Sequence, residues 1–251
     1  MDVLISGASI AGLSTAFWLH RTGWDVTVIE RAEAFRDGGQ NVDVRGVARD
    51  VLARMGLEEA VRRLTTTEEG TAFVDARGRP LARFPVGEDA EGPTAELEIL
   101  RGDLAGLLRD EGPEIRYGRQ ITGTTEHGTD VEVTFRSGAR ERYDLLVIAE
   151  GVRSATRDLV FGPAVERREL GLNVVYGTIP RTPDDDRWWR WYTATGGRAV
   201  NLRPDNGGTT RATLAYTSRD DLSALDRDQM MTELRRVFNG AGWETERVLD
   251  A

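Results

Sequence analysis

The 251-residue sequence contains no cysteine and no lysine, and only two histidines, His20 and His127. Without cysteine there can be no disulfide, no thiolate nucleophile and no cysteine metal site. Two histidines cannot build a histidine metal centre, so we predict that the protein binds no metal. The 33 basic residues are therefore all arginines, and they are outnumbered by 42 acidic residues, giving a formal net charge of −9. Such an acidic chain is a poor candidate for nonspecific nucleic-acid binding.

Long hydrophobic runs are also missing. No apolar stretch approaches the roughly 20 residues that a membrane-spanning helix needs, so we expect no membrane association. The N-terminus enters an apolar strand-like run at once, which is unlike a signal peptide. We therefore expect a cytoplasmic protein. Its hydrophobic content of 39% is sufficient for a core.

The first 31 residues have the pattern of a nucleotide-binding βαβ unit. An apolar run at residues 3–5 leads into the glycine turn GASIAG at residues 7–12, and a helix-length segment extends to about Arg21. A second apolar run at residues 26–29 ends before the acidic Glu30. A strand, a glycine turn, a helix and a second strand followed by an acid are typical of dinucleotide-binding folds.

Each part of this unit has a physical role. Gly7 allows a sharp turn, and Gly12 allows the helix to pack closely on the sheet. The helix N-terminus, at Ser9, Ile10 and Ala11, points unpaired N–H groups at the turn, where a pyrophosphate can bind. Ser9 replaces the middle glycine of G-x-G-x-x-G, and its hydroxyl could either donate to that phosphate or merely narrow the site. The same residues could also form no more than a tight strand–helix turn.

The acid at the end of the second strand indicates which nucleotide is bound. Glu30 can accept two hydrogen bonds from ribose hydroxyls, and as an anion it would repel a 2′-phosphate. The sequence therefore favours FAD or NAD over NADP at this turn.

The rest of the chain predicts further strands and helices of an α/β protein. We expect a hairpin at 71–84, an acidic loop at 87–93, a strand at 97–100 and a helix from there to about Asp110, capped by Asp103. An antiparallel meander is predicted over 116–143, and a buried parallel strand over 145–149, before a helix capped by Ser154.

A second region, built on an antiparallel sheet, follows residue 161. Its predicted strands cover 172–180, 188–193, 198–203 and 210–216, and an amphipathic helix covers 226–238. We therefore divide the chain into domains at 1–161 and 162–251. The aromatic residues at 188–192 suggest a substrate wall, but alternation along a strand puts at most half of them on one face, so core packing or an interface is equally compatible.

These elements occur in the order of one family. The chain resembles the FAD-dependent aromatic hydroxylases, which are single-component flavoprotein monooxygenases with the p-hydroxybenzoate hydroxylase fold. Three motifs carry the resemblance: GASIAG with Glu30 and Arg31, Arg101 opening R-x-D-L before a helix, and LLVIAEGVRSATR at 145–157. In the third motif Glu150 stands where the family usually has aspartate.

The resemblance implies a Rossmann-like FAD-binding domain with an antiparallel meander, followed by a substrate-binding sheet. The cofactor-binding residues that we predict are Gly7, Ser9, Ile10, Ala11, Gly12, Glu30, Arg31, Gln40, Arg45, Arg101, Glu150, Gly151 and Arg157.

Several of these residues also have purely structural interpretations. Arg101 could pair with a surface carboxylate, Glu150 with Gly151 could form an ordinary strand-end turn, and Gln40 and Arg45 could lie in a flexible loop. A further G-D-A motif, which binds the flavin ribityl and phosphate groups in the family, has no counterpart before residue 251. We therefore expect either a fragment of a longer protein or a partner segment on another chain.

The function implied by the resemblance is that of an FAD-dependent monooxygenase. It would use NAD(P)H and O2 to hydroxylate an aromatic or polyketide-like small molecule. No acid–base pair or Ser-His-Asp set stands out in the sequence, so we assign no catalytic residue. Two alternatives stay open: a noncatalytic or truncated FAD-binding module, and an NAD-dependent Rossmann dehydrogenase. The meander argues against the dehydrogenase, in which strands and helices alternate more regularly.

Overall fold

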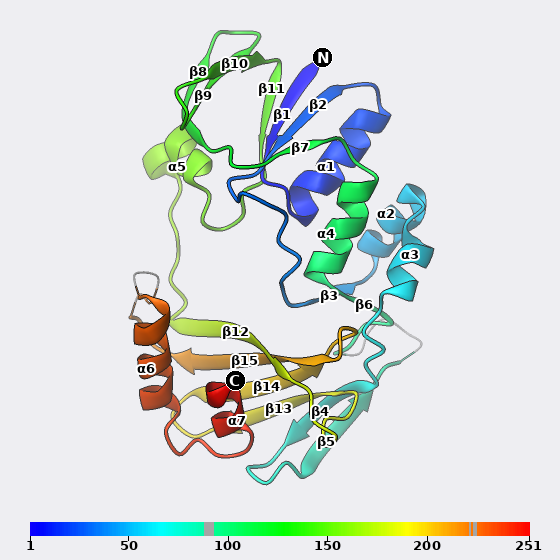
Figure 1. Cartoon of the computed structure of the whole chain (residues 1–251), viewed down its shortest axis with the longest axis vertical. Coiled ribbons are helices and arrows are strands. Elements are labelled where there is room, and N and C mark those ends of the chain that lie inside the picture. The colour runs from blue at the N-terminus through cyan, green and yellow to red at the C-terminus, as the bar shows by residue number, and fades with distance from the viewer. Residues whose placement is uncertain (88–92, 221, 223–224) are drawn as a thin grey trace. The chain divides into compact units, whose positions relative to one another are not determined.

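The computed structural model describes residues 1–87, 93–220, 222 and 225–251 (Figure 1). The chain folds into two compact units, of which unit 1 comprises residues 1–39 and 101–167 and unit 2 comprises residues 40–100 and 168–251. The predicted acidic loop at 87–93 lies largely outside the described residues. Among the residues described, no helix combines the length and the apolarity needed to cross a membrane.

Unit 1 is built on a parallel sheet with strand order β11-β1-β2-β7. Its elements are β1 (Asp2–Ser6), α1 (Ile10–Arg21), β2 (Asp25–Ile29), α4 (Arg101–Asp110), β7 (Ile115–Arg116), β8 (Ile121–Glu126), β9 (Val131–Phe135), β10 (Arg140–Tyr143), β11 (Leu145–Ile148), α5 (Ala155–Phe161) and the 3-10 turn η1 (Gly162–Ala164). The predicted βαβ unit at the N-terminus is confirmed, because β1 and β2 pair in parallel around α1.

The core of unit 1 lies where α1 packs on this sheet. Val3, Leu4 and Ile5 of β1 are fully buried, as are Leu13 and Ala16 of α1. Apolar residues on both faces of β1 are expected for a central parallel strand. Each fully buried leucine or isoleucine contributes about 1.5–3 kcal/mol relative to an exposed one.

The second predicted strand of this sheet, at 145–149, is parallel but only partly buried. β11 pairs with β1 in the expected register, Val3 opposite Leu145. However, Leu145 is 40% exposed, so the prediction of a buried strand was wrong. β11 is exposed because it lies at the edge of the parallel sheet, where β1 is its one hydrogen-bonded neighbour.

The meander forms a separate antiparallel sheet in the order β10-β9-β8, as predicted. Its first strand begins later than expected, at Ile121. Ile115 and Arg116 instead pair in parallel with β2 and extend the other sheet. The predicted cap of α5 is confirmed, because the side chain of Ser154 accepts a hydrogen bond from the backbone N–H of Arg157.

Unit 2 is built on a six-stranded sheet with the order β12-β15-β14-β13-β4-β5. Its elements are β3 (Asn41–Val44), α2 (Val47–Met55), α3 (Glu58–Arg63), β4 (Gly70–Val74), β5 (Pro80–Pro85), β6 (Leu97–Leu100), β12 (Leu172–Pro180), β13 (Trp188–Ala194), β14 (Arg198–Pro204), β15 (Thr209–Thr217), α6 (Arg227–Phe238) and α7 (Thr245–Asp250). The four predicted C-terminal strands and the 71–84 hairpin are therefore present.

The hairpin joins the C-terminal strands, which the sequence did not indicate. β4 pairs in parallel with β13, so that Phe73 lies opposite Trp191. Residues 40–100 accordingly group with the C-terminal sheet, whereas we expected one boundary after residue 161. Local patterning cannot reveal this grouping, because the pairing joins segments more than 110 residues apart. Which unit binds which ligand stays a prediction.

Helices α6 and α7 cover one face of this sheet (Figure 1). Tyr192 points to that face, where it is buried and donates a hydrogen bond to the carbonyl oxygen of Ala241 at 2.6 Å. Trp189 and Trp191 alternate with it and lie on the opposite face, with ring centroids 4.7 Å apart. The aromatic run is thus split between a helix-covered core and a second face, as strand alternation requires.

Two expected helix ends were tested by the structure. The predicted helix after β6 begins at Arg101, so Asp103 lies in its first turn and the prediction that it caps the helix was wrong. The predicted helix 226–238 begins after Asp226, whose side chain accepts from the backbone N–H of Gln229 at 2.9 Å. The Gln229 side chain accepts in turn from the backbone N–H of Asp226, which completes a capping box.

We predict that Asp226→Ala lowers the free energy of unfolding by about 1 kcal/mol, because the backbone N–H of Gln229 loses its side-chain acceptor. Asp228→Ala is the matched control, since Asp228 lies in the same first turn but is not the cap. Chemical denaturation of both variants measures the difference. Equal losses would show that the charge of the first turn, and not the cap, is what stabilises α6.

Candidate functional site

A pocket of about 170 Å³ lies in unit 1, where the glycine turn, the segment after β2 and the start of α4 meet. Its lining residues are Ala8, Ser9, Glu30, Ala32, Ala34, Phe35, Arg36, Gly38, Arg101, Gly102, Ala105 and Tyr117. Three of the predicted cofactor-binding residues, Ser9, Glu30 and Arg101, are therefore brought together although they are far apart in the sequence.

The glycine turn explains how the backbone comes so close to this pocket. A Cβ on Gly12 would lie 1.8 Å from the carbonyl oxygen of Gly7, and one on Gly7 would lie 2.5 Å from the carbonyl oxygen of Ala149. Gly7 also has a positive φ of 109°. Both glycines are therefore required by contact with backbone atoms, which cannot move aside as a flexible side chain could.

The N-terminus of α1 is suited to an anion. Ser9 is the N-cap residue, but its side chain makes no capping hydrogen bond, and there is no acidic residue in the first turn. The first N–H groups of a helix have no acceptor within the helix, and its dipole is positive at this end. The first-turn N–H groups and the Ser9 hydroxyl can therefore donate to a phosphate.

Glu30 closes the other side of the pocket with an oriented carboxylate. Its Oε2 accepts from the backbone N–H of Ala8 at 3.1 Å, and its Oε1 accepts from the backbone N–H of Ala32 at 2.9 Å. Each carboxylate oxygen has a second lone pair, so the group can still accept from a ligand. The two backbone contacts fix the carboxylate in place, which favours binding of a diol such as the ribose hydroxyl pair.

The third wall is a loop packed against the start of α4. Arg101 donates from Nη2 to the carbonyl oxygen of Gly38 at 3.1 Å. A Cβ on Gly102 would lie 1.6 Å from the carbonyl oxygen of Asp37, and one on Gly39 would lie 2.5 Å from Nε of Arg101. Gly102 therefore lets the start of α4 approach the backbone of Asp37, and Gly39 lets the loop approach the side chain of Arg101.

Glu150 does not line this pocket but joins the end of β1 to the start of α5. Oε1 accepts from the hydroxyls of Ser6 at 2.5 Å and Thr156 at 2.6 Å. Oε2 accepts from the Ser154 hydroxyl at 2.8 Å and from the Thr156 backbone N–H at 3.1 Å. Burial alone would raise the pKa of Glu150, but the donors from Ser6, Thr156 and Ser154 hold that pKa below its usual value.

The remaining predicted residues are placed as follows. Ile10 and Ala11 begin α1. Arg31 is exposed and is not among the lining residues. Gly151 is exposed in a turn with a φ of 79°, and Arg157 pairs with Asp158 at 2.7 Å.

Two further predicted residues, Gln40 and Arg45, belong to unit 2 and are not among the lining residues of the unit 1 pocket. Arg45 pairs with Asp43 there, at 3.3 Å. Their role in cofactor binding stays a prediction.

Sequence reasoning missed several lining residues. Arg36, Phe35 and Tyr117 line the pocket. Phe35 also packs under the guanidinium of Arg109, 4.4 Å from the ring centroid. The sequence marks them only by position, since Phe35 and Arg36 follow β2 and Tyr117 follows β7, the strand that pairs with β2. No group of histidine, cysteine or acidic residues in the described part of the chain could hold a metal ion.

Comparison with known proteins places this geometry in a family. A family model described as FAD binding domain matches residues 1–246. The flavin-dependent monooxygenase eupH of Phoma sp. is 35% identical over 269 residues, which cover all of this chain and 62% of eupH. The uncharacterized protein Rv1260 of Mycobacterium tuberculosis is 35% identical over 254 residues, covering 98% of this chain and 68% of Rv1260.

Solved structures with the same fold include a tetracycline destructase and an FAD complex. The tetracycline destructase Tet(55) superposes with a TM-score of 0.83 at 30% identity, covering 99% of this chain and 64% of Tet(55). Klebsiella pneumoniae HpxO, solved with FAD and uric acid, superposes with a TM-score of 0.80 at 25% identity, covering all of this chain and 65% of HpxO. The chain thus spans somewhat less than two-thirds of the length of eupH and of both solved proteins.

We predict that Glu150→Gln lowers the free energy of unfolding by about 1–3 kcal/mol, because an amide NH2 group replaces one carboxylate oxygen and faces two donors. Because the folded-state pKa of Glu150 lies below the unfolded value, its contribution is present above that value and is lost as the pH falls through the folded pKa. The wild-type protein should therefore lose more stability than the variant between about pH 6 and about pH 3.

Thermal unfolding across this pH range measures the effect. Glu126→Gln is the control, because Glu126 is exposed on β8. Identical acid profiles for wild type and Glu150→Gln would contradict the assignment of a stabilising carboxylate at this position.

Proposed function

The chain belongs to the FAD binding domain family, and on this premise we propose that its unit 1 pocket binds the adenosine and pyrophosphate part of FAD. The observation that carries the proposal is the conjunction, in one pocket, of an oriented carboxylate and a helix N-terminus without a side-chain cap. The first suits the ribose hydroxyls, and the second suits the pyrophosphate.

The residues present fit that part of the cofactor. Gly7 and Gly12 let the backbone turn without a Cβ in the way, so that the first-turn N–H groups and the Ser9 hydroxyl can donate to phosphate oxygens. Glu30 would accept from the ribose. Arg101, held by the carbonyl of Gly38, would supply positive charge near the phosphates.

We further propose that the whole protein is an FAD-dependent monooxygenase. The bound flavin would supply the redox chemistry, taking a hydride from NAD(P)H and activating O2. The substrate would be an aromatic or polyketide-like small molecule, in keeping with the name of the tetracycline destructase Tet(55) and with the uric acid in the HpxO structure. This proposal includes a cytoplasmic location, where NAD(P)H is available.

In this scheme the chain's own residues bind and position, and no side chain is assigned a proton-transfer role. The face of the unit 2 sheet that carries Trp189 and Trp191 is the candidate substrate wall, since flat aromatic surfaces stack on planar molecules. α6 and α7 pack on the other face of that sheet, so core residues cover much of it.

The first test is the visible absorption spectrum of the purified chain after incubation with FAD and desalting. Flavin that stays with the protein supports the cofactor proposal. Loss of the flavin absorbance with NAD(P)H and its return in air support the oxygenase proposal. Flavin that is retained but not reduced would favour a noncatalytic FAD-binding module, and exchange of FAD for bound NAD would favour a dehydrogenase.

We predict that Glu30→Gln weakens FAD binding about tenfold, the effect of losing one hydrogen bond to a charged group. Glu33→Gln is the matched control, because Glu33 lies on the same segment with an exposed side chain outside the pocket lining. Fluorescence titration of the flavin gives both affinities. Equal affinities for the two variants would remove Glu30 from the site.

A second pair of variants separates two arginines five residues apart. We predict that Arg36→Gln weakens FAD binding about fivefold, which corresponds to roughly 1 kcal/mol for an exposed ion contact. Arg31→Gln should have little effect, since Arg31 is exposed away from the lining residues. The salt dependence of the affinity should fall only in the Arg36 variant. The reverse order would restore Arg31 as the cofactor ligand.

A further inference from the structure

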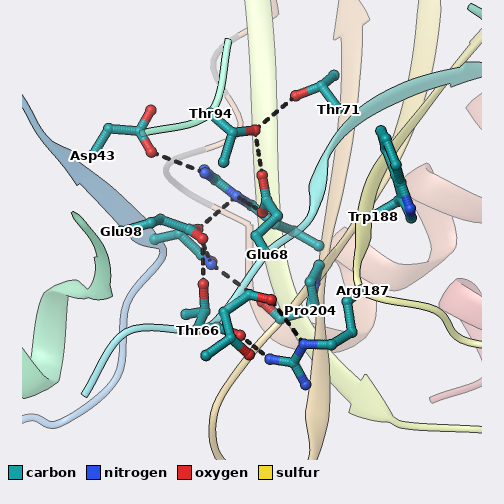
Figure 2. Close-up of polar contacts among 12 residues, drawn as sticks. Asp43, Thr66, Glu68, Thr71, Thr94, Glu98, Arg187, Trp188 and Pro204 are labelled. Atoms are coloured by element: carbon teal, nitrogen blue, oxygen red, sulfur yellow. Dashed lines mark hydrogen bonds and ion pairs between the residues drawn. The ribbon is translucent and has the colours of Figure 1, made fainter. Parts of the chain in front are cut away.

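A buried charged cluster in unit 2 has no part in the proposed cofactor site. At its centre is Arg203 on β14, whose side chain is 10% exposed. Its Nε lies 2.7 Å from Glu68 Oε2 and 2.7 Å from Glu98 Oε1, and its Nη2 donates to Asp43 Oδ1 at 3.0 Å. The ring of Trp189 lies against the guanidinium, 3.9 Å from its carbon to the ring centroid. Figure 2 shows Asp43, Glu68 and Glu98 together with the polar contacts drawn in this region.

The two glutamates are more deeply buried than the arginine. The side chains of Glu68 and Glu98 are only 1% and 2% exposed. Thr94 donates to Glu68 Oε1 at 2.5 Å and also contacts Thr71 at 3.0 Å, as Figure 2 shows. Burial of two carboxylates at this depth is costly unless each is neutralised or fully hydrogen-bonded.

A single N–H group has to serve both glutamates. Nε of an arginine carries one hydrogen, yet it is the atom nearest to both Glu68 and Glu98. The other donors to Glu98 are the side chains of Asn41 and Thr66. Neither is charged, so they reduce but do not remove the repulsion between two ionised glutamates.

The charges of the cluster do not balance when every carboxylate is ionised. Asp43, Glu68 and Glu98 bring three negative charges, while Arg203 and the partly exposed Arg45 bring two positive ones. Asp43 and Glu98 are directly opposite each other in the β3–β6 pair, an arrangement that is unfavourable for like charges. One additional proton would neutralise the group.

The protonation energetics agree with this count. Burial raises the pKa of Glu98 to about 7, against the lowering effect of Arg203 and with a further raising effect from Glu68. Burial also raises the pKa of Glu68, again opposed by Arg203. Two buried acids that lie against the same guanidinium N–H and repel each other titrate as a pair, with one proton held tightly.

We propose that Glu68 and Glu98 share one proton at neutral pH, and that its release to solvent as the pH rises loosens the β3–β6 ribbon from the unit 2 sheet. The ribbon is residues 41–44 and 97–100, which pair antiparallel with each other. It carries Asp43 and Glu98, whereas Arg203 belongs to the six-stranded sheet. The cluster is therefore the polar attachment between the two sheets, and its protonation sets how tightly they associate.

A further arginine, Arg187, keeps its positive charge but directs its donors away from the Glu98 carboxylate. Arg187 donates to the backbone carbonyl oxygens of Thr66 and Thr67, which hold the chain beside Glu98 without pairing with its carboxylate. Deprotonation therefore leaves Arg203 as the buried cation between two ionised glutamates. Repulsion between them is large at short range in a low-dielectric interior.

Infrared spectroscopy of the wild-type chain tests the shared proton directly. The stretching band of a protonated carboxyl group, assigned by isotope labelling of the glutamates, should be present at about pH 6 and should disappear toward about pH 8.5. A spectrum without such a band at about pH 6 would overturn the proposal. This measurement uses the wild-type protein, so it does not depend on whether a variant folds.

The Glu98→Gln variant tests whether the shared proton affects the stability of the folded protein. In the wild type the folded state binds the proton more tightly than the unfolded state does. The stabilisation that this proton provides is therefore complete at low pH. It is lost as the pH rises from the unfolded-state pKa of Glu98, near 4.5, toward its folded-state pKa of about 7. The melting temperature should fall by about 5 °C over that range, and the fall should be absent in Glu98→Gln. Glu69→Gln is the control, since Glu69 is adjacent to Glu68 but exposed.

Hydrogen exchange locates the change. After correction for the intrinsic effect of pH, amides of 41–44 and 97–100 should exchange faster above neutral pH in the wild type and in Glu69→Gln, but not in Glu98→Gln. If Glu98→Gln does not fold, Glu68→Gln removes the same shared proton and takes its place. A pH-independent exchange of the ribbon in the wild type would show the cluster to be a fixed structural cross-link.

Discussion

The close packing of the glycine turn is the constraint on which unit 1 depends. The space between Gly12 and the carbonyl oxygen of Gly7 excludes any Cβ, and Gly7 itself is in contact with Ala149 at the end of β11. These contacts fix where α1 begins relative to β1 and β11, and they direct the free N–H groups of its first turn toward the end of β2. Glu30 is then held in position by the backbone N–H of Ala8, within that same turn. Helix, turn and acid therefore form one rigid arrangement, and a single side chain at either glycine would displace all three.

Partly or fully buried carboxylates connect neighbouring segments of this protein at three places, and each is stabilised differently. Glu30 accepts from backbone N–H groups and retains lone pairs toward a pocket, which suits a ligand. Glu150 accepts four protein donors and has no need of a ligand, and its hydrogen bonds outweigh its burial. Glu98 is buried with too few positive charges nearby, so its burial outweighs the pairing with Arg203. The number of hydrogen-bond donors around a carboxylate and its burial thus decide whether it can bind a ligand, stabilise a turn or retain a proton.

The sequence predicted local features well and distant pairings poorly, for a physical reason. The βαβ unit, the meander and the cap at Ser154 are encoded within a few residues by apolar periodicity, glycine and capping chemistry. Ser9, Glu30 and Arg101, which line one pocket, were predicted as cofactor-binding residues from motifs whose relative positions are fixed by the fold. By contrast, the parallel pairing of β4 with β13 leaves no local signature, because either edge of a hairpin can accept a partner. Arg36 and Tyr117 were missed for the same reason: their loops gain meaning only when the sheet brings them together.

The order of the chain connects the segments that carry the Arg203 cluster with the segments that line the unit 1 pocket. The chain leaves unit 1 after Gly39 and returns at Arg101, so both strands of the β3–β6 ribbon continue directly into segments that line the pocket. A ribbon held firmly by Arg203 restricts the backbone on either side of it, including Gly38 and Arg101, which are joined by a hydrogen bond. Loosening the ribbon would raise the conformational entropy of those two pocket segments in the free protein, and a ligand would have to overcome that entropy on binding. Affinity at the pocket should accordingly follow the protonation of Glu68 and Glu98, although neither residue belongs to the pocket.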